Sequence, residues 1–580
     1  MSLSIRLLGR PALRGADGGR TIAGQKPWAL LAYLLLRPEG ATRRELAELL
    51  WPEAEDPLAA ARWTILQVRR AIEPAATLAE ANGRLVVRAG PGESEISVDA
   101  VSLLDGRFEP TLVDELVGGD LLEGMTFADA PEFEDWLALQ RARLSSAAGA
   151  ALRWAALLAA RPEPSRALGL VDRALAFDPY DDAAHELGIR IEAERGSRAS
   201  AAARLAGAER RYRTELGVEP PATLRRPLDR PPTRVGTVSP DAAAQAQLDS
   251  ARARLDVGDY DAAIDTARRA VSAAAASGDQ ALEAEALAVL AGVLIHSVRG
   301  RDHEAIGLLD HALELAVRQG RERLAAEIER ELGYVAFLDA HYGAAESILR
   351  RAAEQATAAG DPAGSARART ILGACQSDRA DYVSAEETLT DAVERLRDLD
   401  DRWEPFAASF LARVRLRTGR EEEARPIADR AVDRSRELGW LALLPWPMVV
   451  AGEARLGAGE PDAAGRTFDS AYALACEIGD PCWQAFALRG LGLVAARTGD
   501  PVGAMRLLVE AAEAAASLPD VYAWCEAVIL TDLVELEGGR DPEHVALALS
   551  IARQGPMPDL VARLSSVTML AQTPLQTRYR

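Results

Sequence analysis

The sequence predicts a mainly α-helical protein that begins with a winged helix-turn-helix (α+β) and ends in an α-solenoid of paired helices. Its 580 residues are rich in Ala, Leu, Arg and Glu and only 5% aromatic, a composition typical of helical proteins. Near the N-terminus, a helix with arginines on its outer face lies between a capping box and strand-like segments. From residue 245 onward a motif recurs about every 40 residues, which indicates a helical-repeat array.

Charge and length bound the possible partners. The chain is too long for a single core, so several domains are expected. Its net charge is −21, but residues 1–100 hold 13 basic and 12 acidic side chains. An acidic protein repels DNA overall, so any DNA contact must come from a local patch. The first hundred residues are the segment that departs from the acidic trend.

Several functional classes are excluded by motif. Lys26 is the only lysine and does not lie in the Gly-Lys-Ser/Thr context of a P-loop. HExxH and Gly-x-Ser-x-Gly motifs are also absent from the sequence, so no enzyme, catalytic residue, cofactor or metal is expected. The four cysteines lie far apart, as in reduced proteins. Because no apolar run reaches the ~20 residues of a membrane span, we expect a soluble cytoplasmic protein that does not bind membranes.

The first hundred residues contain the elements of a winged helix. The capping box Thr42–Glu45 opens one helix, and Asn82-Gly83 is a turn signal. We expect the last two strand segments to pair as a hairpin, the wing. The expected strands and helices are Ser4–Leu8, Pro11–Arg14, Pro27–Leu36, Arg43–Leu50, Asp56–Glu73, Leu85–Arg88 and Glu95–Val98.

The helix Asp56–Glu73 is the expected recognition helix. Asp56 can cap its free amides and Pro57 suits its first turn. One face is apolar, and the opposite face carries arginines that can enter the major groove of DNA. Its buried face is expected to consist of Ala61, Ile65, Val68 and Ile72, and its outer face of Arg62, Trp63, Leu66, Gln67, Arg69 and Arg70.

The candidate DNA contacts come from three elements of this domain. Arg43 and Arg44 are either contacts or solvated first-turn residues, and Arg84 and Arg88 are either wing contacts or ordinary strand-edge charges. Trp63 and Leu66 either touch thymine methyls or pack on another subunit. The full set of candidates is Arg43, Arg44, Arg62, Trp63, Gln67, Arg69, Arg70, Arg84 and Arg88.

Residues 1–228 resemble a family of bacterial regulators. Lys26–Leu34, Leu50–Pro52, Val68–Ile72 and Val98–Asp99 are similar to the DNA-binding half of SARP-type regulators. The resemblance continues into the bacterial transcriptional activator domain (BTAD), on the motifs Gly119–Gly124, Trp136, Arg141, Phe177–Pro179 and Glu215–Pro220.

The resemblance implies binding to double-stranded promoter DNA and activation through RNA polymerase. It leaves a homodimer open. The acidic residues that precede the recognition helix must face away from phosphate and become candidate polymerase contacts; they are Glu53, Glu55 and Asp56.

The middle of the chain is expected to be helical and structural. Ala167 and Ala201 are 34 residues apart, the period of tetratricopeptide (TPR) repeats. A proline-rich stretch follows and is expected to be an extended linker. The expected divisions are 1–100 (winged helix), 101–224 (BTAD, TPR-like), 225–244 (linker) and 245–570 (solenoid).

The solenoid is predicted from regularly spaced alanines. Their intervals are 42, 40, 40, 39, 40 and 40 residues, and the alanines are Ala263, Ala305, Ala345, Ala385, Ala424, Ala464 and Ala504. Probable helix-ending glycines recur with them at Gly278, Gly320, Gly360, Gly439 and Gly479. About eight TPR-like helix pairs are expected, with a degenerate unit near 541–546 as the cap.

Five tryptophans concentrate in the second half of this array. They either pack between helices or form a site for an unknown protein or small-molecule effector; they are Trp403, Trp440, Trp446, Trp483 and Trp524. The sequence therefore predicts a DNA-binding transcriptional regulator, an activator modulated through its array. The alternative is a non-enzymatic interaction scaffold whose winged helix no longer reads DNA and binds protein through Trp63 and Leu66.

Overall fold

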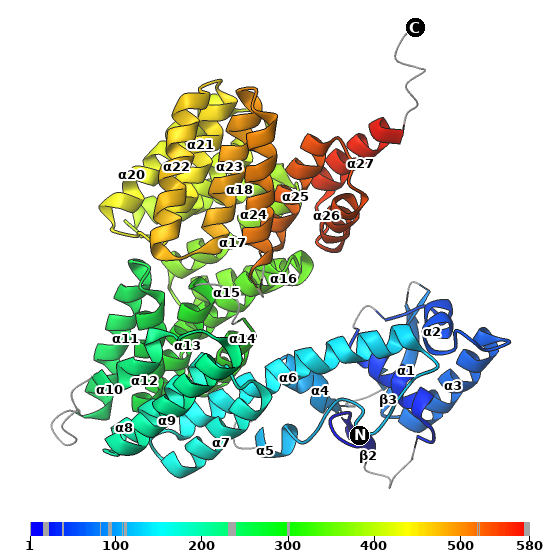
Figure 1. The fold of residues 1–580 in the computed structure, drawn as a ribbon. Coiled ribbons are helices and arrows are strands. Elements are labelled where there is room, and N and C mark those ends of the chain that lie inside the picture. Colours follow the sequence, from blue (N-terminus) through cyan, green and yellow to red (C-terminus); the bar gives the residue numbers. More distant parts are fainter. Residues whose placement is uncertain are drawn as a thin grey trace. The chain divides into compact units, whose positions relative to one another are not determined.

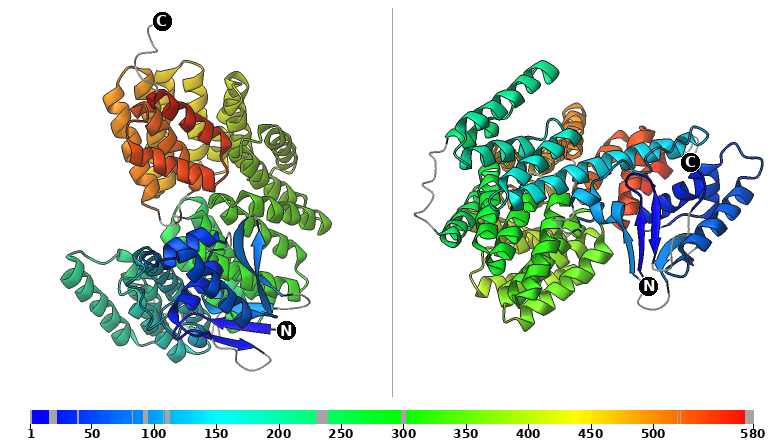
Figure 2. Two further views of the ribbon diagram at one scale, coloured as in Figure 1. Left: turned by 90° about the vertical axis from the view of Figure 1, so that its right-hand side faces the viewer. Right: turned by 90° about the horizontal axis from the view of Figure 1, so that it is seen from below.

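The computed structural model describes residues 2–15, 22–37, 40–81, 83–90, 95–106, 108, 113–229, 239–297, 302–518, 520 and 522–572. The chain divides into two compact units, Met1–Thr237 and Val238–Arg580. The first holds a winged helix and a helical domain, and the second is a stack of helix pairs (Figures 1 and 2). The predicted fold class is confirmed. Of the helices in the described ranges, none is long and apolar enough to cross a membrane.

The winged helix begins its helices at the predicted caps. The Thr42 hydroxyl accepts a hydrogen bond from the Glu45 amide at 3.1 Å, and the Thr42 amide donates to the Glu45 carboxylate at 2.8 Å. The Asp56 carboxylate accepts from the Ala59 amide at 2.8 Å. The elements are β1 Ser2–Arg6, β2 Ala12–Gly15, α1 Gln25–Leu35, α2 Arg43–Leu50, α3 Pro57–Ile72, β3 Ala76–Ala81, β4 Arg84–Ala89 and β5 Glu95–Val98.

The strand pairing differs from the expected one. β3 pairs antiparallel with β4, so the wing is this hairpin, while β5 pairs in parallel with β1 and β2 lies antiparallel on the other side of β1. The expectation that Leu85–Arg88 pairs with Glu95–Val98 is wrong. A two-residue Asn-Gly turn favours a hairpin across itself, but Ala76–Ala81 is alanine-rich and has weak β propensity. Asn82 itself lies outside the described residues.

The helical domain of the first unit is built from paired helices. Ala167 in α7 and Ala201 in α9 are both fully buried, as expected for small residues where helices approach closely. α6 is a single long helix that reaches from α1 to α7 (Figure 1). The elements are α4 Asp99–Leu104, α5 Val113–Leu116, α6 Pro131–Ala159, α7 Pro164–Phe177, α8 Asp182–Glu194, α9 Arg198–Arg211, η2 Tyr212–Leu216, η3 Ala222–Arg225 and α10 Arg226–Asp229.

The stretch 225–244, expected to be an extended linker, is helical at both ends. Residues 226–229 form α10, and α11 begins at Pro240, where the Ser239 hydroxyl accepts from the Ala242 amide at 3.3 Å. This serine followed by proline is a helix start that the proline content of the stretch hid from the sequence reading. Residues 230–238 lie outside the described residues.

The second unit consists of eight consecutive helix pairs and a final helix, which confirms the predicted number. These helices are α11 Pro240–Asp256, α12 Tyr260–Ser277, α13 Gln280–His296, α14 Asp302–Arg318, α15 Glu322–Leu338, α16 Tyr342–Ala358, α17 Pro362–Asp378, α18 Tyr382–Asp398, α19 Glu404–Arg417, α20 Glu421–Glu437, α21 Pro445–Gly457, α22 Pro461–Ile478, α23 Pro481–Arg497, α24 Pro501–Ala516, α25 Ala523–Glu537, α26 Pro542–Gln554 and α27 Pro558–Gln572. Arg301, the first residue of one repeat motif, lies outside the described residues.

The repeat motif is explained by packing within each pair. The seven spaced alanines are all completely buried. Twelve residues before four of them stands a glycine, and a Cβ added at one of these, Gly373, would lie 2.5 Å from the Leu389 side chain. The glycine therefore lets two helices approach closely. The five helix-ending glycines all have positive φ, between 63° and 77°, which confirms their predicted role as C-caps.

The array closes on itself. Arg402, just before α19, donates two hydrogen bonds of 2.6 Å to Asp256 at the end of α11. The Ala442 amide, before α21, donates to the Asp256 carbonyl at 3.2 Å. The first helix pair thus contacts segments that are about four repeats further along the chain, and the helices between them surround a central space.

Candidate functional site

α3 presents one buried and one exposed face, as its periodicity predicts. Ala61, Ile65, Val68 and Ile72 are each at most 5% exposed. On the opposite face Trp63 is 69% exposed, Leu58 45% and Leu66 41%. Large apolar side chains so exposed are unusual on a helix and mark a contact surface.

Two exposed arginines flank these apolar side chains. Arg62 and Arg70 lie four residues before and after Leu66, and therefore on the same face. Arg62 is 3.8 Å from Asp56, with both side chains more than 60% exposed. An ion pair so exposed is weak, so this guanidinium can exchange its partner for another anion.

Two other candidates on α3 help to hold the helix in place. Arg69 donates to the carbonyl of Leu78 in β3 at 3.1 Å, and Gln67 donates to the carbonyl of Ala23, before α1, at 2.9 Å. These contacts fix the rotation of α3 relative to its neighbours.

The arginines of α2 have acidic partners. Arg43 pairs with Glu80 of β3 at 2.8 Å, and Arg44 pairs with Glu48 one turn along α2 at 2.7 Å. All four side chains are at least 44% exposed, so these pairs too compete with water.

The wing arginines differ from each other. Arg84 donates to the carbonyl of Gly40 at 3.0 Å and pairs with Glu45 at 3.0 Å, whereas Arg88 is exposed at the far end of β4. Burial raises the pKa of Glu45, but the Thr42 amide and Arg84 more than offset this and lower it below its usual range. Arg84 therefore ties the wing to the start of α2.

Gly40 seats the wing against the helices. Its φ is +70°, and an added Cβ would lie 2.2 Å from the carbonyl oxygen of Leu85. The next residue, Ala41, exchanges two backbone hydrogen bonds with Leu85, of 2.7 and 3.1 Å. Only glycine permits this close approach of the α1–α2 connection to β4.

The three candidate polymerase contacts precede α3. Glu53, Glu55 and Asp56 are all exposed. Asp56 also caps the helix, so its carboxylate is directed at the first turn of α3.

The second unit encloses a cavity of about 590 Å³. It is lined by side chains from the first helix of each of the eight pairs, from α11 to α25. Four of the five candidate tryptophans, Trp403, Trp440, Trp446 and Trp483, lie on its wall. Trp524 does not: it is 4% exposed, and the Arg413 guanidinium lies 4.3 Å from its ring centroid.

The sequence reading did not single out the other aromatic residues of this wall. They share helices with the tryptophans or occupy the same positions in neighbouring repeats, which is the signal that would have found them; they are Tyr334, Phe337, Phe406, Phe410 and Tyr522. A charged cluster borders them. His296 lies 2.8 Å from Glu331, and although burial raises the pKa of Glu331, His296 and Arg330 lower it well below its usual range.

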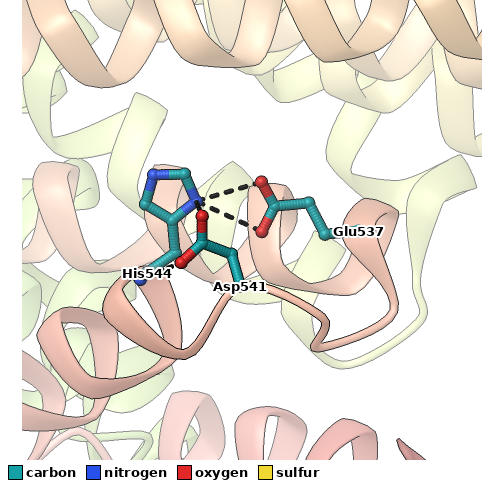
Figure 3. A group of neighbouring side chains, drawn as sticks. All are labelled: Glu537, Asp541 and His544. Carbon is teal, nitrogen blue, oxygen red and sulfur yellow. Dashed lines mark hydrogen bonds and ion pairs between the residues drawn. The ribbon is translucent and has the colours of Figure 1, made fainter.

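Within the described part of the chain, one group of potential metal ligands lies close together, near the start of α26 (Figure 3). His544 Nδ1 is 3.0 Å from Glu537 and 3.7 Å from Asp541. Asp541 also accepts from the Glu543 amide at 2.9 Å, as the cap of α26. Capping and ion pairing account for the cluster, so we assign no metal to it.

Comparison with known families identifies the middle of the chain. Residues 101–229 match the family described as the bacterial transcriptional activator domain. This segment is a bacterial transcriptional activator domain. No curated protein sequence is significantly similar to the chain.

The activator domain packs directly on the winged helix within the first unit. Leu121 bridges Leu8, and the Gly9 amide donates to the Asp120 carbonyl at 2.9 Å. Trp136 of α6 lies against Tyr33 of α1, with ring centroids 4.8 Å apart. The motif residues that carry the family resemblance therefore join the two domains.

Lys26 makes a further junction between these domains. Its ammonium donates to the Leu50 carbonyl at the end of α2 at 2.7 Å and to Asp129 of the activator domain at 2.9 Å. The single lysine of the chain is thus structural.

Three solved structures show the range of similar folds. A Rap protein complexed with Competence and Sporulation Factor is 16% identical, over 68% of this chain and 97% of its own, with a TM-score of 0.37. EmbR of Mycobacterium tuberculosis, in complex with a low-affinity phosphopeptide, is 17% identical over 39% and 63%, with a TM-score of 0.30. NprR in complex with its cognate peptide NprX is 13% identical over 57% and 98%, with a TM-score of 0.38. At TM-scores below 0.5 we draw nothing further from these matches.

Proposed function

We propose that the protein is a DNA-binding transcriptional regulator, an activator without enzymatic activity, whose repeat array binds an effector. One observation carries the proposal: a helix with exposed Arg62 and Arg70 stands in a winged helix joined directly to a bacterial transcriptional activator domain. Such a regulator acts in the cytoplasm, on double-stranded promoter DNA.

The dimensions of α3 suit the major groove. Its 16 residues span about 24 Å, and the groove of about 12 Å width admits one helix. Arg62 and Arg70 would contact guanine edges or phosphates, while Trp63 and Leu66 would contact thymine methyl groups. This local basic face allows binding despite the net charge of −21.

The remaining candidates divide by their contacts. Arg43, Arg44 and Arg88 would reach phosphates, since their present partners are weak or they are exposed. The three tied side chains, Gln67, Arg69 and Arg84, would chiefly hold α3 and the wing in position. Glu53 and Glu55 would face RNA polymerase.

An interaction scaffold is the second candidate function. It is favoured by the 69% exposure of Trp63, because a protein partner would cover this side chain more completely than a DNA groove would.

Substitution of Arg70 separates the two functions. Arg70→Ala is expected to weaken binding to DNA from the region upstream of the coding sequence by 5-fold or more, since one arginine contact to a base is worth about 1–3 kcal/mol. Fluorescence anisotropy with labelled DNA measures the affinity. The matched control is Arg506→Ala in α24, an exposed arginine paired within its own helix. Equal affinities of the two variants would favour the scaffold.

A further inference from the structure

We propose that the cavity of the repeat array binds a flat, uncharged aromatic molecule that carries a hydrogen-bond acceptor. The inference rests on the proposed function only in calling this molecule the effector. It goes beyond that function in naming the chemical class of the ligand.

The shape of the wall favours fused rings. Trp446 and Trp483 are stacked, with centroids 5.6 Å apart and planes at 29°, and Trp403 and Trp440 lie 6.4 Å apart. All four line the cavity, whose volume of about 590 Å³ falls within the range of small-molecule sites. Aromatic faces grouped in this way contact a planar ring system over a large area.

The charges of the wall are already compensated. Of the six arginines that line the cavity, five are bound to carboxylates or backbone carbonyls. Arg402 holds Asp256, for example, and Arg367 holds Asp401. A charged ligand would have to break such a pair, and a peptide would place its amides against aromatic faces. Both are disfavoured relative to an uncharged ring system.

One buried donor on the wall has no partner. The indole N–H of Trp446, a residue that is 2% exposed, makes no hydrogen bond within the described structure. By contrast, the indole N–H of Trp483 donates to the Ala442 carbonyl at 3.1 Å. Because a buried donor without an acceptor costs free energy, a carbonyl or ether oxygen on the ligand would be bound there.

The cavity also touches the contact that closes the array. Arg402 and Asp256 both line it, and Asp256 ends α11, the first helix after the activator domain in the chain. A bound molecule therefore contacts the pair that fixes this helix, which gives the effector a route to the rest of the chain.

Filling the cavity tests the proposal without removing a core side chain. Gly292 of α13 lines the cavity, and a Cβ added there meets no atom within 4 Å. Gly292→Phe is therefore expected to occupy the space without disturbing the fold. The matched control is Gly343→Phe, at an exposed glycine of α16 whose added Cβ also meets nothing within 4 Å.

The probe is 1,8-dihydroxyanthraquinone, three fused rings with carbonyl acceptors, titrated into the full-length protein while tryptophan fluorescence is recorded. We expect saturable quenching by wild type and Gly343→Phe, and a dissociation constant at least 10-fold higher for Gly292→Phe. Absence of saturable quenching, or equal binding by both variants, would overturn the proposal.

Two further probes test the ligand class. Cyclododecanol is apolar but not flat, and an acetylated and amidated pentapeptide offers amides without end charges. We expect both to bind at least 10-fold more weakly than the anthraquinone, and tighter binding of either overturns the assignment. The titrations contain no DNA, so their failure is distinct from failure of the proposed DNA binding, which is measured separately on the same variants.

Discussion

Replacing Arg413 with methionine is expected to lower the free energy of unfolding of the repeat array by about 3–5 kcal/mol, the cost of leaving a buried charge without its partner. Arg413 is 1% exposed and forms an ion pair with Asp378, which is fully buried. Its guanidinium also lies 4.3 Å from the Trp524 ring centroid and 4.8 Å from that of Phe410. Urea unfolding followed by circular dichroism measures the loss.

Controls separate this effect from a general loss of charge. Arg434→Met removes a pair whose Asp400 is 86% exposed and should cost less than about 1 kcal/mol. The double variant Arg413→Met/Asp378→Asn should recover part of the loss, because the buried charge is gone. Equal losses for Arg413→Met and Arg434→Met would contradict this account of the core.

The same loss should depend on pH. Burial raises the pKa of Asp378, and Arg413 opposes that rise. Without Arg413 the pKa rises further, so the folded state binds a proton more readily than the unfolded state does. Stability is then gained as pH falls through the folded pKa, and the deficit of Arg413→Met should shrink as the medium is acidified.

Reversing both exposed arginines of α3 is expected to reduce affinity for upstream DNA at least 100-fold. Arg62→Glu/Arg70→Glu removes two cationic contacts and places two carboxylates against the phosphates, so attraction becomes repulsion. Both side chains are exposed, and the four residues of the buried face are unchanged. The fold should therefore persist, and anisotropy titration measures the affinity.

The control has the same change in net charge elsewhere. Arg466→Glu/Arg506→Glu reverses two exposed arginines on α22 and α24 of the array. It should bind DNA within about 3-fold of wild type, because binding depends on the local face and distant exposed charges are screened. Similar losses in both double variants would show that net charge, not α3, governs the affinity.

The elements that sequence predicted well are specified by neighbouring residues. The capping box at Thr42, the cap at Asp56 and the apolar face of α3 each depend on residues within one or a few turns. The solenoid was predictable because its packing repeats every 40 residues. Such local and periodic information is readable without a structure.

What sequence missed depends on contacts between distant residues. The strand that pairs with β4 is alanine-rich, so it had no strong signal of its own. The cavity exists because Arg402 meets Asp256, 146 residues earlier, and nothing local announces that pair. Likewise, only the structure distinguishes Arg84, bound to Gly40, from the exposed Arg88.

The salt dependence of DNA binding tests the central claim most directly. Wild-type full-length protein is titrated against labelled DNA from its own upstream region between 50 and 300 mM salt. If α3 and the wing dock on DNA through about five phosphates, the logarithm of the affinity should fall linearly with the logarithm of salt, with a slope near −4 to −5. Absence of salt-sensitive binding at any of these concentrations would contradict the account and leave α3 as a protein-binding helix.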